Sequence, residues 1–268
     1  MKGRVLVIQL TRTGDLVQTL QAVRQFKAET PGIECSLIAR KSLGKGIQFL
    51  LETVFEKIYY IDTKELLTGG TFKSGLSELH KFLKDVNHVT YDVSVNFSYN
   101  KSSSYLHSLV NSNQKIGLYR NDKTEVSVTD PWSQFVYSNV MRGSNNPFNL
   151  VDIYRYTLGC KELSVLQESA DQKHEKRIVI HPFASSKKKS WGATKWVEVI
   201  YKVLNEYQEH SIHIVGAPSD QDEAYKIINS PALKGIENRI FSHVGEFHIS
   251  DTYSLLQRSE LFIGHDSL

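Results

Sequence analysis

A carboxylate at the end of an apolar segment is placed for acid–base chemistry. The run Arg4–Leu10 is apolar and rich in β-branched residues, which is typical of a strand buried on both faces of a parallel sheet. A short loop follows, and Asp15 then opens a helical pattern. The loop consists of Thr11, Arg12, Thr13 and Gly14. Such a carboxylate can accept a proton from a bound hydroxyl group, but aspartate is also a favoured helix N-cap and glycine a common turn residue, so both interpretations stay open.

A run of hydroxyl and lysine side chains lies at a second junction between a predicted strand and a predicted helix. Ser185 and Ser186 offer hydroxyl donors, and Lys187–Lys189 offers positive charge. The first turn of the helix adds free backbone N–H groups and the positive end of its dipole. Together these groups suit a phosphate or a pyrophosphate. The alternative is a solvated lysine run in which Trp191 and Trp196 serve as packing anchors.

Two further junctions carry polar residues after a predicted strand. Asp220 lies where one strand turns into an acidic helix start, and it can either cap that helix or bind the hydroxyls of a ribose. Asp266 and Ser267 follow the last predicted strand, together with His265. Because ligands of open α/β sheets bind at the carboxyl ends of the strands, all four junctions are expected to face a ligand crevice.

Several other chemistries lack their motifs. The sequence contains no G-x-G-x-x-G, which speaks against a nicotinamide-dependent epimerase or dehydrogenase, and no G-x-S-x-G elbow of a serine hydrolase. The ten histidines are scattered without metal-ligand spacing, so we expect no metal site and read them as surface or hydrogen-bonded residues. Cys35 and Cys160 cannot form a disulfide framework, which favours a reducing cytoplasm.

The elements that would position these residues alternate between strand and helix in both halves. Expected strands cover 4–10, 33–39, 57–61, 91–97, 177–180, 211–215, 239–241 and 261–263. Expected helices cover 16–30, 76–86, 104–110, 149–158, 195–207, 220–228 and 251–258, and residues 115–150 are expected to be less regular. The polar run 168–176 is the predicted linker. The pattern therefore predicts an α/β protein of two Rossmann-like, doubly wound domains facing a cleft, at 1–167 and 177–268.

Composition fits a globular chain with an uneven charge. Of the 268 residues, 40% are hydrophobic and 23% charged, and the longest apolar run near the start has far fewer than the ~20 residues of a spanning helix. The net charge of +3 combines +5 over residues 1–165 with −2 over the remainder. The first half is therefore the one expected to face an anionic partner.

Together, these motifs resemble those of glycosyltransferase family 9, the ADP-heptose:lipopolysaccharide heptosyltransferase type. The opening VLVIQLTRTGDLVQTLQAVRQFK is similar to that family's first strand, Ser/Thr-rich turn, Gly-Asp pair and helix. HPFASSKKKSWGATKWVEVI and VGAPSDQDEA resemble two elements of its second domain. DTYSLLQRSELFIGHDS resembles the helix and strand before its Asp-Ser/Thr-Gly turn. Residues 40–150 carry little of the resemblance.

The resemblance implies a GT-B architecture and an inverting sugar transfer without a metal ion or other cofactor. It implies that an ADP-sugar is the donor, bound by the second domain, and that a lipopolysaccharide-core or related glycan is the acceptor, bound mainly by the first. By this likeness Asp15 is the catalytic base, with residues 11–14 as the acceptor-side loop. Lys189, Ser185 and Ser186 match the donor diphosphate site, Asp220 more loosely matches the ribose site, and Asp266 with Ser267 matches the nucleotide-sugar turn.

The sequence departs from the family pattern at its end. Asp266-Ser267 is followed by Leu268, where the family has Gly and, soon after, His, so the second domain is expected to be incomplete. The expected function is a cytoplasmic glycosyltransferase with a peripheral contact to the inner membrane and no nucleic-acid partner. The alternative is a degenerate, non-catalytic GT-B relative that binds a nucleotide or a protein partner.

Overall fold

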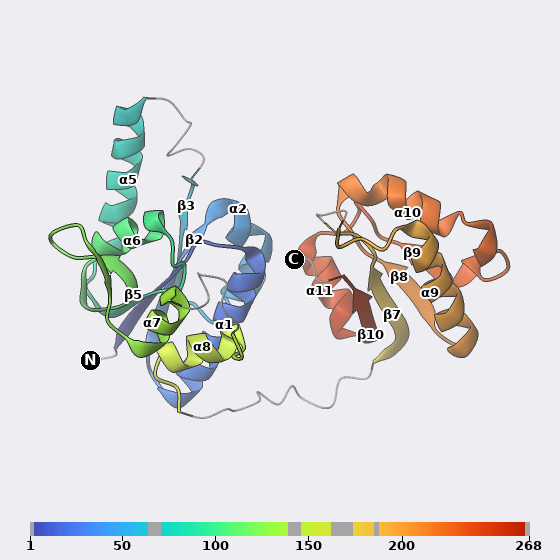
Figure 1. Cartoon of the computed structure of the whole chain (residues 1–268), viewed down its shortest axis with the longest axis horizontal. Coiled ribbons are helices and arrows are strands. Elements are labelled where there is room, and N and C mark those ends of the chain that lie inside the picture. Colours follow the sequence, from blue (N-terminus) through green and yellow to red (C-terminus); the bar gives the residue numbers. More distant parts are fainter. Residues whose placement is uncertain (1–2, 64–70, 139–145, 162–173, 185–187, 266–268) are drawn as a thin grey trace. The chain divides into compact units, whose positions relative to one another are not determined.

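The computed structural model describes residues 3–63, 71–138, 146–161, 174–184 and 188–265. The chain divides into two compact units, Met1–Leu166 and Gln167–Leu268, and each has its own sheet, mostly parallel in the first and fully parallel in the second (Figure 1). Among the described residues, no helix is both long enough and apolar enough to cross a lipid bilayer.

The first unit is built on a six-stranded sheet in the order β3-β2-β1-β4-β5-β6. Its strands are β1 (Arg4–Gln9), β2 (Glu34–Arg40), β3 (Lys57–Ile61), β4 (Tyr91–Asn96), β5 (Ser112–Arg120) and β6 (Val126–Val128). All neighbours pair in parallel except β5 and β6, which pair antiparallel. The helices are α1 (Thr13–Glu29), α2 (Lys41–Gly44), α3 (Gln48–Leu51), α5 (Phe72–Val86), α6 (Lys101–Ser108), α7 (Pro131–Ser138) and α8 (Leu150–Thr157). The strand order reverses direction between β1 and β4, which is where doubly wound folds bind ligands.

Strand β1 lies inside the sheet, between β2 and β4, and helices cover both of its faces. Val5 and Val7 pack in the core that α1 and α8 complete, whereas Leu6 and Ile8 pack in the core on the side of α5 and α6. Burying such a side chain stabilises a fold by about 1.5–3 kcal/mol, so this alternation fixes the strand firmly in the sheet. The end of β1 is therefore a rigid base for the loop and helix that follow.

The second unit has a four-stranded parallel sheet in the order β10-β7-β8-β9. Its strands are β7 (Glu175–His181), β8 (Ser211–Ile214), β9 (Ile240–Ser242) and β10 (Ser259–Gly264), and its helices are α9 (Ala193–Glu206), α10 (Gln221–Ile228) and α11 (Ile249–Gln257). Helices α9 and α10 cover one face through residues such as Trp196, Ile200 and Ile227. Leu255 of α11 packs on Val179 and Val215 on the other face. Here the order reverses between β7 and β10.

The predicted α/β class with two doubly wound units is confirmed, and the structure corrects two details. The interval 115–150, predicted to be less regular, contains most of β5 together with β6 and α7, so that prediction is wrong. Strand β7 begins at Glu175, two residues before the predicted start and inside the predicted linker, of which residues 168–173 lie outside the described part.

Candidate functional site

Asp15 is the third residue of α1, which begins four residues after β1 ends. Its side chain is half-buried, and its Oδ2 atom accepts hydrogen bonds from the Thr11 hydroxyl at 2.5 Å and from the Arg12 backbone N–H at 3.2 Å. The carboxylate thereby satisfies one of the free N–H groups of the helix start. Thr13 and Gly14 form the first turn of α1, so Gly14 lies inside the helix rather than in a turn before it.

Gln9, the last residue of β1, is fully buried and connects this loop to the rest of the unit. Its amide nitrogen donates to the Thr19 hydroxyl and to the Tyr154 hydroxyl, both at 3.2 Å. Its Oε1 atom accepts from the Thr11 N–H at 3.2 Å, from the Thr11 hydroxyl at 2.6 Å and from the Ser98 hydroxyl at 3.3 Å. The Gln9 amide therefore connects α1, α8 and the loop after β4 to Thr11, whose hydroxyl donates to Asp15.

The loops after β1 and β4 meet where the strand order reverses. The Leu10 N–H donates to the Ser98 hydroxyl at 2.7 Å, and the Ser98 N–H donates to Asn96 Oδ1 at 2.9 Å.

Burial raises the pKa of Tyr154, and the negative charge of Asp15 raises it further, so the phenol keeps its proton at neutral pH. Asp15 therefore lies in the place where this fold class binds ligands, within a network of neutral hydroxyl and amide groups.

In the second unit, the loop after β7 leads to the start of α9. Gly192 precedes this 14-residue helix with φ +78°, a conformation that favours glycine, and Lys189 is exposed in the loop. The N-terminal turn of α9 carries no acidic residue, so its dipole is not offset there. Ser185 and Ser186 lie outside the described residues.

His265, directly after β10, packs against two tryptophans at the start of α9. Its Nε2 atom accepts a hydrogen bond from the Trp196 indole N–H at 3.0 Å and one from the Trp191 backbone N–H at 3.4 Å. Because both partners can only donate, the ring proton of the neutral imidazole lies on Nδ1. Trp196 is 1% exposed and anchors the helix, whereas Trp191 is 54% exposed in the loop before it. Asp266 and Ser267, which come next, lie outside the described residues.

Asp220 caps the turn that follows β8. Its Oδ2 atom accepts the Ala217 N–H at 2.8 Å, whereas it makes no side-chain cap bond to α10, so the predicted capping of that helix is wrong and the carboxylate closes the turn before it. Burial lowers the pKa of His181 at the end of β7, the charge of Asp220 opposes that shift and His265 adds to it. The charges of Asp220 and His265 thus act on His181 at the carboxyl ends of neighbouring strands, the edge at which open α/β sheets bind ligands.

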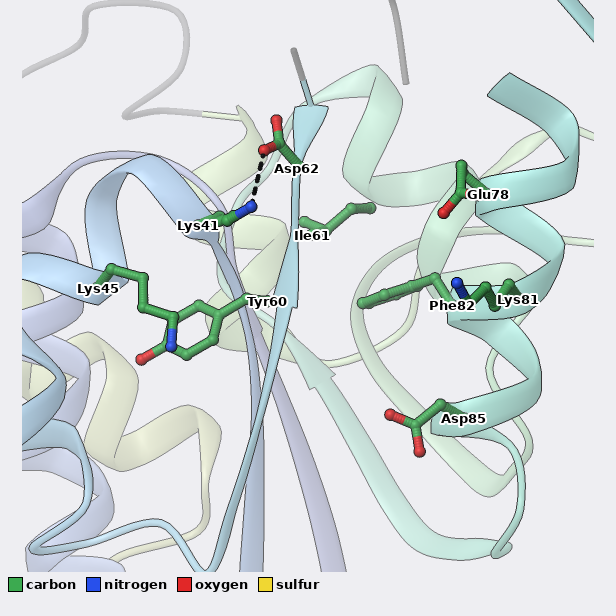
Figure 2. A pocket seen from close by; sticks show the side chains of 9 residues that line it. All are labelled: Lys41, Lys45, Tyr60, Ile61, Asp62, Glu78, Lys81, Phe82 and Asp85. Carbon is green, nitrogen blue, oxygen red and sulfur yellow. Dashed lines mark ion pairs between the residues drawn. The ribbon is translucent and has the colours of Figure 1, made fainter. Parts of the chain in front are cut away.

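A separate cavity of about 460 Å³ lies between β3 and α5 in the first unit (Figure 2). On one side Lys41 pairs with Asp62 at 3.5 Å, and the Lys45 ammonium lies 4.5 Å from the centre of the Tyr60 ring. The residues that α5 contributes are Glu78, Lys81, Phe82 and Asp85. The lining includes three lysines and three carboxylates, so their formal charges cancel, and Asp15 is not among the lining residues.

Sequence reasoning gave no role to Gln9, Tyr154 or Ser98, and it placed His265 at a predicted junction without assigning it a role. A polar residue at the end of an otherwise apolar strand was the available signal for Gln9. Its partners, and those of His265, become visible only once distant segments are brought together. Among the described residues, no group of three or more His, Cys, Asp or Glu side chains is arranged to hold a metal ion.

Comparison with known proteins supplies the family. The model of glycosyltransferase family 9 (heptosyltransferase) matches residues 79–267, and no curated protein has a matching sequence. Escherichia coli heptosyltransferase WaaC, solved with ADP-2-deoxy-2-fluoro heptose, has a TM-score of 0.72 and 14% identity over 98% of this chain and 83% of that one. A family 9 glycosyl transferase from Veillonella parvula has a TM-score of 0.72 and 15% identity over 99% and 75%. E. coli ADP-heptose lps heptosyltransferase II has a TM-score of 0.67 and 14% identity over 100% and 80%, and at such identities the likeness shows the fold.

Proposed function

This chain belongs to glycosyltransferase family 9, and on that premise we propose that it moves a heptose-type sugar from an ADP-sugar to a hydroxyl of a lipopolysaccharide-core glycan. The resemblance drawn from the sequence motifs is confirmed, and the chain is a glycosyltransferase with a GT-B-like fold. WaaC is solved with ADP-2-deoxy-2-fluoro heptose and with ADP, which supports an ADP-sugar as the donor here.

The position of Asp15 carries the proposal. Its carboxylate lies where the strand order of the first unit reverses, and two donors hold one of its oxygens. In the proposed reaction Asp15 removes the proton of the acceptor hydroxyl as that oxygen attacks the anomeric carbon. The bond to the diphosphate breaks on the opposite face, so the anomeric configuration inverts. Thr11, Arg12, Thr13 and Gly14 form the acceptor-side loop in this proposal.

The second unit is proposed to bind the donor. The exposed Lys189 and the N-terminus of α9 supply positive potential for the diphosphate, in place of a metal ion. Ser185 and Ser186 are proposed to add hydroxyl donors, Asp266 and Ser267 to form the nucleotide-sugar turn, and Asp220 to contact the ribose. The support for Asp220 is its place at the ligand edge, although its Oδ2 atom also caps a turn. Transfer without a metal ion remains a prediction.

The acceptor side and the location are proposed from charge. Residues 1–165 carry a net charge of +5, which suits an anionic, lipid-linked glycan at the cytoplasmic face of the inner membrane. We therefore place the protein in the cytoplasm with a peripheral membrane contact. The proposed domain limits are 1–167 and 177–268, with the linker between them.

The test is sugar transfer from ADP-heptose to a heptose-deficient lipopolysaccharide core, followed by ADP release and by mass spectrometry of the glycan. Asp15→Asn should lower kcat at least 100-fold, the lower end of what a general base contributes. The ADP affinity measured by calorimetry should stay within about twofold, because Asp15 and the proposed donor site lie in different units. Wild-type transfer should persist in the presence of EDTA.

Asp122→Asn is the matched control, since Asp122 is an exposed carboxylate in a turn of the same unit. It should leave kcat unchanged. Turnover by Asp15→Asn at the wild-type rate would contradict the assigned base. A wild-type chain that binds ADP but transfers no sugar would favour the degenerate, non-catalytic relative instead.

A further inference from the structure

At the proposed base, a single hydroxyl proton has two possible acceptors. The Thr11 hydroxyl oxygen lies 2.5 Å from Asp15 Oδ2 and 2.6 Å from Gln9 Oε1. Both neighbours are acceptors when Asp15 is ionised, and a hydroxyl has a single proton to donate. The orientation of the Gln9 amide follows from the Thr11 backbone N–H, which can only donate and therefore faces Oε1.

Gln9 Oε1 and Asp15 Oδ2 differ in their other hydrogen-bond donors. Gln9 Oε1 also accepts from the Thr11 N–H, and the Ser98 hydroxyl can donate either to Oε1 at 3.3 Å or to the Ile8 carbonyl at 3.5 Å, so Oε1 does not need the Thr11 hydroxyl and yet has a lone pair to offer it. Asp15 Oδ2 has only the Thr11 hydroxyl and the Arg12 N–H among the described residues. A charged acceptor also forms the stronger hydrogen bond, so the Thr11 proton points to Asp15 while Asp15 is a carboxylate.

We propose that Gln9 and Thr11 form a positioning pair, in which the Thr11 hydroxyl holds Asp15 Oδ2 before proton transfer and turns to Gln9 Oε1 after it. The proposal rests on the proposed function, in which Asp15 is the base. Thr11 and Arg12 occupy Oδ2, and no hydrogen bond joins Oδ1 to any residue in the described part of the chain, so Oδ1 is the atom that receives the proton.

The step balances without any further reactant. The O–H bond of the acceptor breaks, its proton forms an Oδ1–H bond on Asp15, and its electron pair forms the new bond to the anomeric carbon. The electron pair of the broken glycosidic C–O bond leaves with ADP. Thr11 keeps its own proton and only rotates, so no heavy atom of the pair has to move.

This arrangement answers a general difficulty for a hydrogen-bonded base. A donor that favours the carboxylate also weakens it as a base, because the bond loses strength when the charge is neutralised. A hydroxyl with a second acceptor within reach recovers that loss by turning. Gln9 supplies this acceptor from a fully buried position that Thr19 and Tyr154 hold in place. The neutral side chain of Gln9 is essential here, because a cationic residue has no acceptor atom.

Two pairs of variants test the proposal with ADP-heptose and the heptose-deficient core. Thr11→Val removes the hydroxyl at nearly constant volume, and we expect kcat to fall about tenfold or more, but by less than the 10²- to 10⁴-fold that loss of the general base itself costs. Thr11→Ser restores the hydroxyl and should recover kcat to within about threefold of wild type. The KM for ADP-heptose and the affinity for ADP should stay within about twofold in both. Gln9→Met removes the second acceptor and should lower kcat while Thr11 is intact.

Thr90→Val, an exposed position in the same unit, is the matched control and should leave kcat unchanged. Thermal melting establishes that each variant is folded. A Thr11→Val variant with wild-type kcat overturns the proposal, and so does one whose KM and ADP affinity change as much as its kcat. If Gln9→Met does not fold, the contrast between Thr11→Val and Thr11→Ser still decides.

A measurement without substrate separates this inference from the proposed function. The Thr11 hydroxyl proton, held between two close oxygens, should give a low-field proton NMR resonance in the wild-type chain and in Thr11→Ser. The resonance should be absent in Thr11→Val and should move in Asp15→Asn. Its absence from the wild type overturns the positioning pair. Its presence in a chain that transfers no sugar supports the pair and contradicts the proposed function.

Discussion

The buried imidazole of His107 gives the first unit a pH-dependent stability. His107 lies in α6 at 0% exposure, with Nε2 at 2.8 Å from the Ser94 hydroxyl and Nδ1 at 3.1 Å from the Leu118 carbonyl. Burial lowers its pKa from 6.5 to about 4, and the charge of Lys115 contributes, while the contacts to backbone carbonyls oppose the shift. The folded unit therefore favours the neutral ring.

The sign and size of the effect follow from that shift. Above pH 6.5 the ring is neutral in both the folded and the unfolded chain, so the stability is fully present. As the pH falls below 6.5, His107 binds a proton in the unfolded chain, whereas in the folded chain it stays neutral down to about pH 4. One pKa unit corresponds to 1.36 kcal/mol, so this residue lowers the free energy of unfolding by about 3 kcal/mol across that window.

His107→Gln tests this because glutamine has an amide in a similar place but does not titrate. At pH 7 the variant should be less stable by about 1–3 kcal/mol, since ring packing and a hydrogen bond are lost. From pH 7 to pH 4.5 it should lose about 2–3 kcal/mol less than the wild type. Urea unfolding followed by hydrogen-exchange mass spectrometry on peptides of β4 and β5 reports this unit separately.

The matched control is His80→Gln, at an exposed position of α5, which should keep the wild-type slope of stability against pH. Acidic groups of the unit titrate in both chains and cancel in the comparison. An His107→Gln chain that loses as much stability as the wild type between pH 7 and pH 4.5 would refute the reasoning.

Gly117 and the two cysteines give further predictions. Gly117 has φ +91° and an added Cβ would lie 2.3 Å from the Asn96 carbonyl oxygen, so Gly117→Ala should destabilise the first unit by at least about 2 kcal/mol in urea unfolding. Gly32→Ala, at φ +85° but in open space, should cost only about 1 kcal/mol, and equal costs would contradict the steric argument. Cys35 and Cys160 are buried, and burial raises their pKa values to about 12 and about 11. Iodoacetamide at pH 8 should therefore label them only after unfolding in urea, and rapid labelling of the native chain would oppose this.

The sequence predicted elements whose apolar pattern is strong. β1 and α1 place Asp15 at a strand end as the spacing indicated, and Trp196 anchors α9 as its packing interpretation expects. β5 was not predicted because its sequence SNQKIGLYR is mostly polar. The strand is held instead by pairing with β4 and β6 and by the close approach of Gly117 to Asn96. Such contacts leave no periodic signal in the residues themselves.

The side-chain networks at the carboxyl ends of the two sheets could not be predicted for a related reason. The Nε2 atom of Gln9 meets Tyr154 across 145 positions of the chain, and Trp196 meets His265 across 69. Neither residue type alone indicates a partner so far away. The sequence therefore located the strand ends at which we propose ligand binding, whereas the groups that orient the side chains there follow only from the tertiary fold.

The hydrogen bond between Gln9 and Tyr154 also sets an order of events during synthesis. Asp15 and its loop leave the ribosome early, but the hydroxyl that steadies Gln9 belongs to α8, the last described helix of the first unit. A nascent chain that ends before residue 150 therefore carries the aspartate without the finished setting around it. The proposed acceptor side of the site is therefore complete only once α8 has been made and the first unit has folded, and the proposed donor side still awaits the second unit.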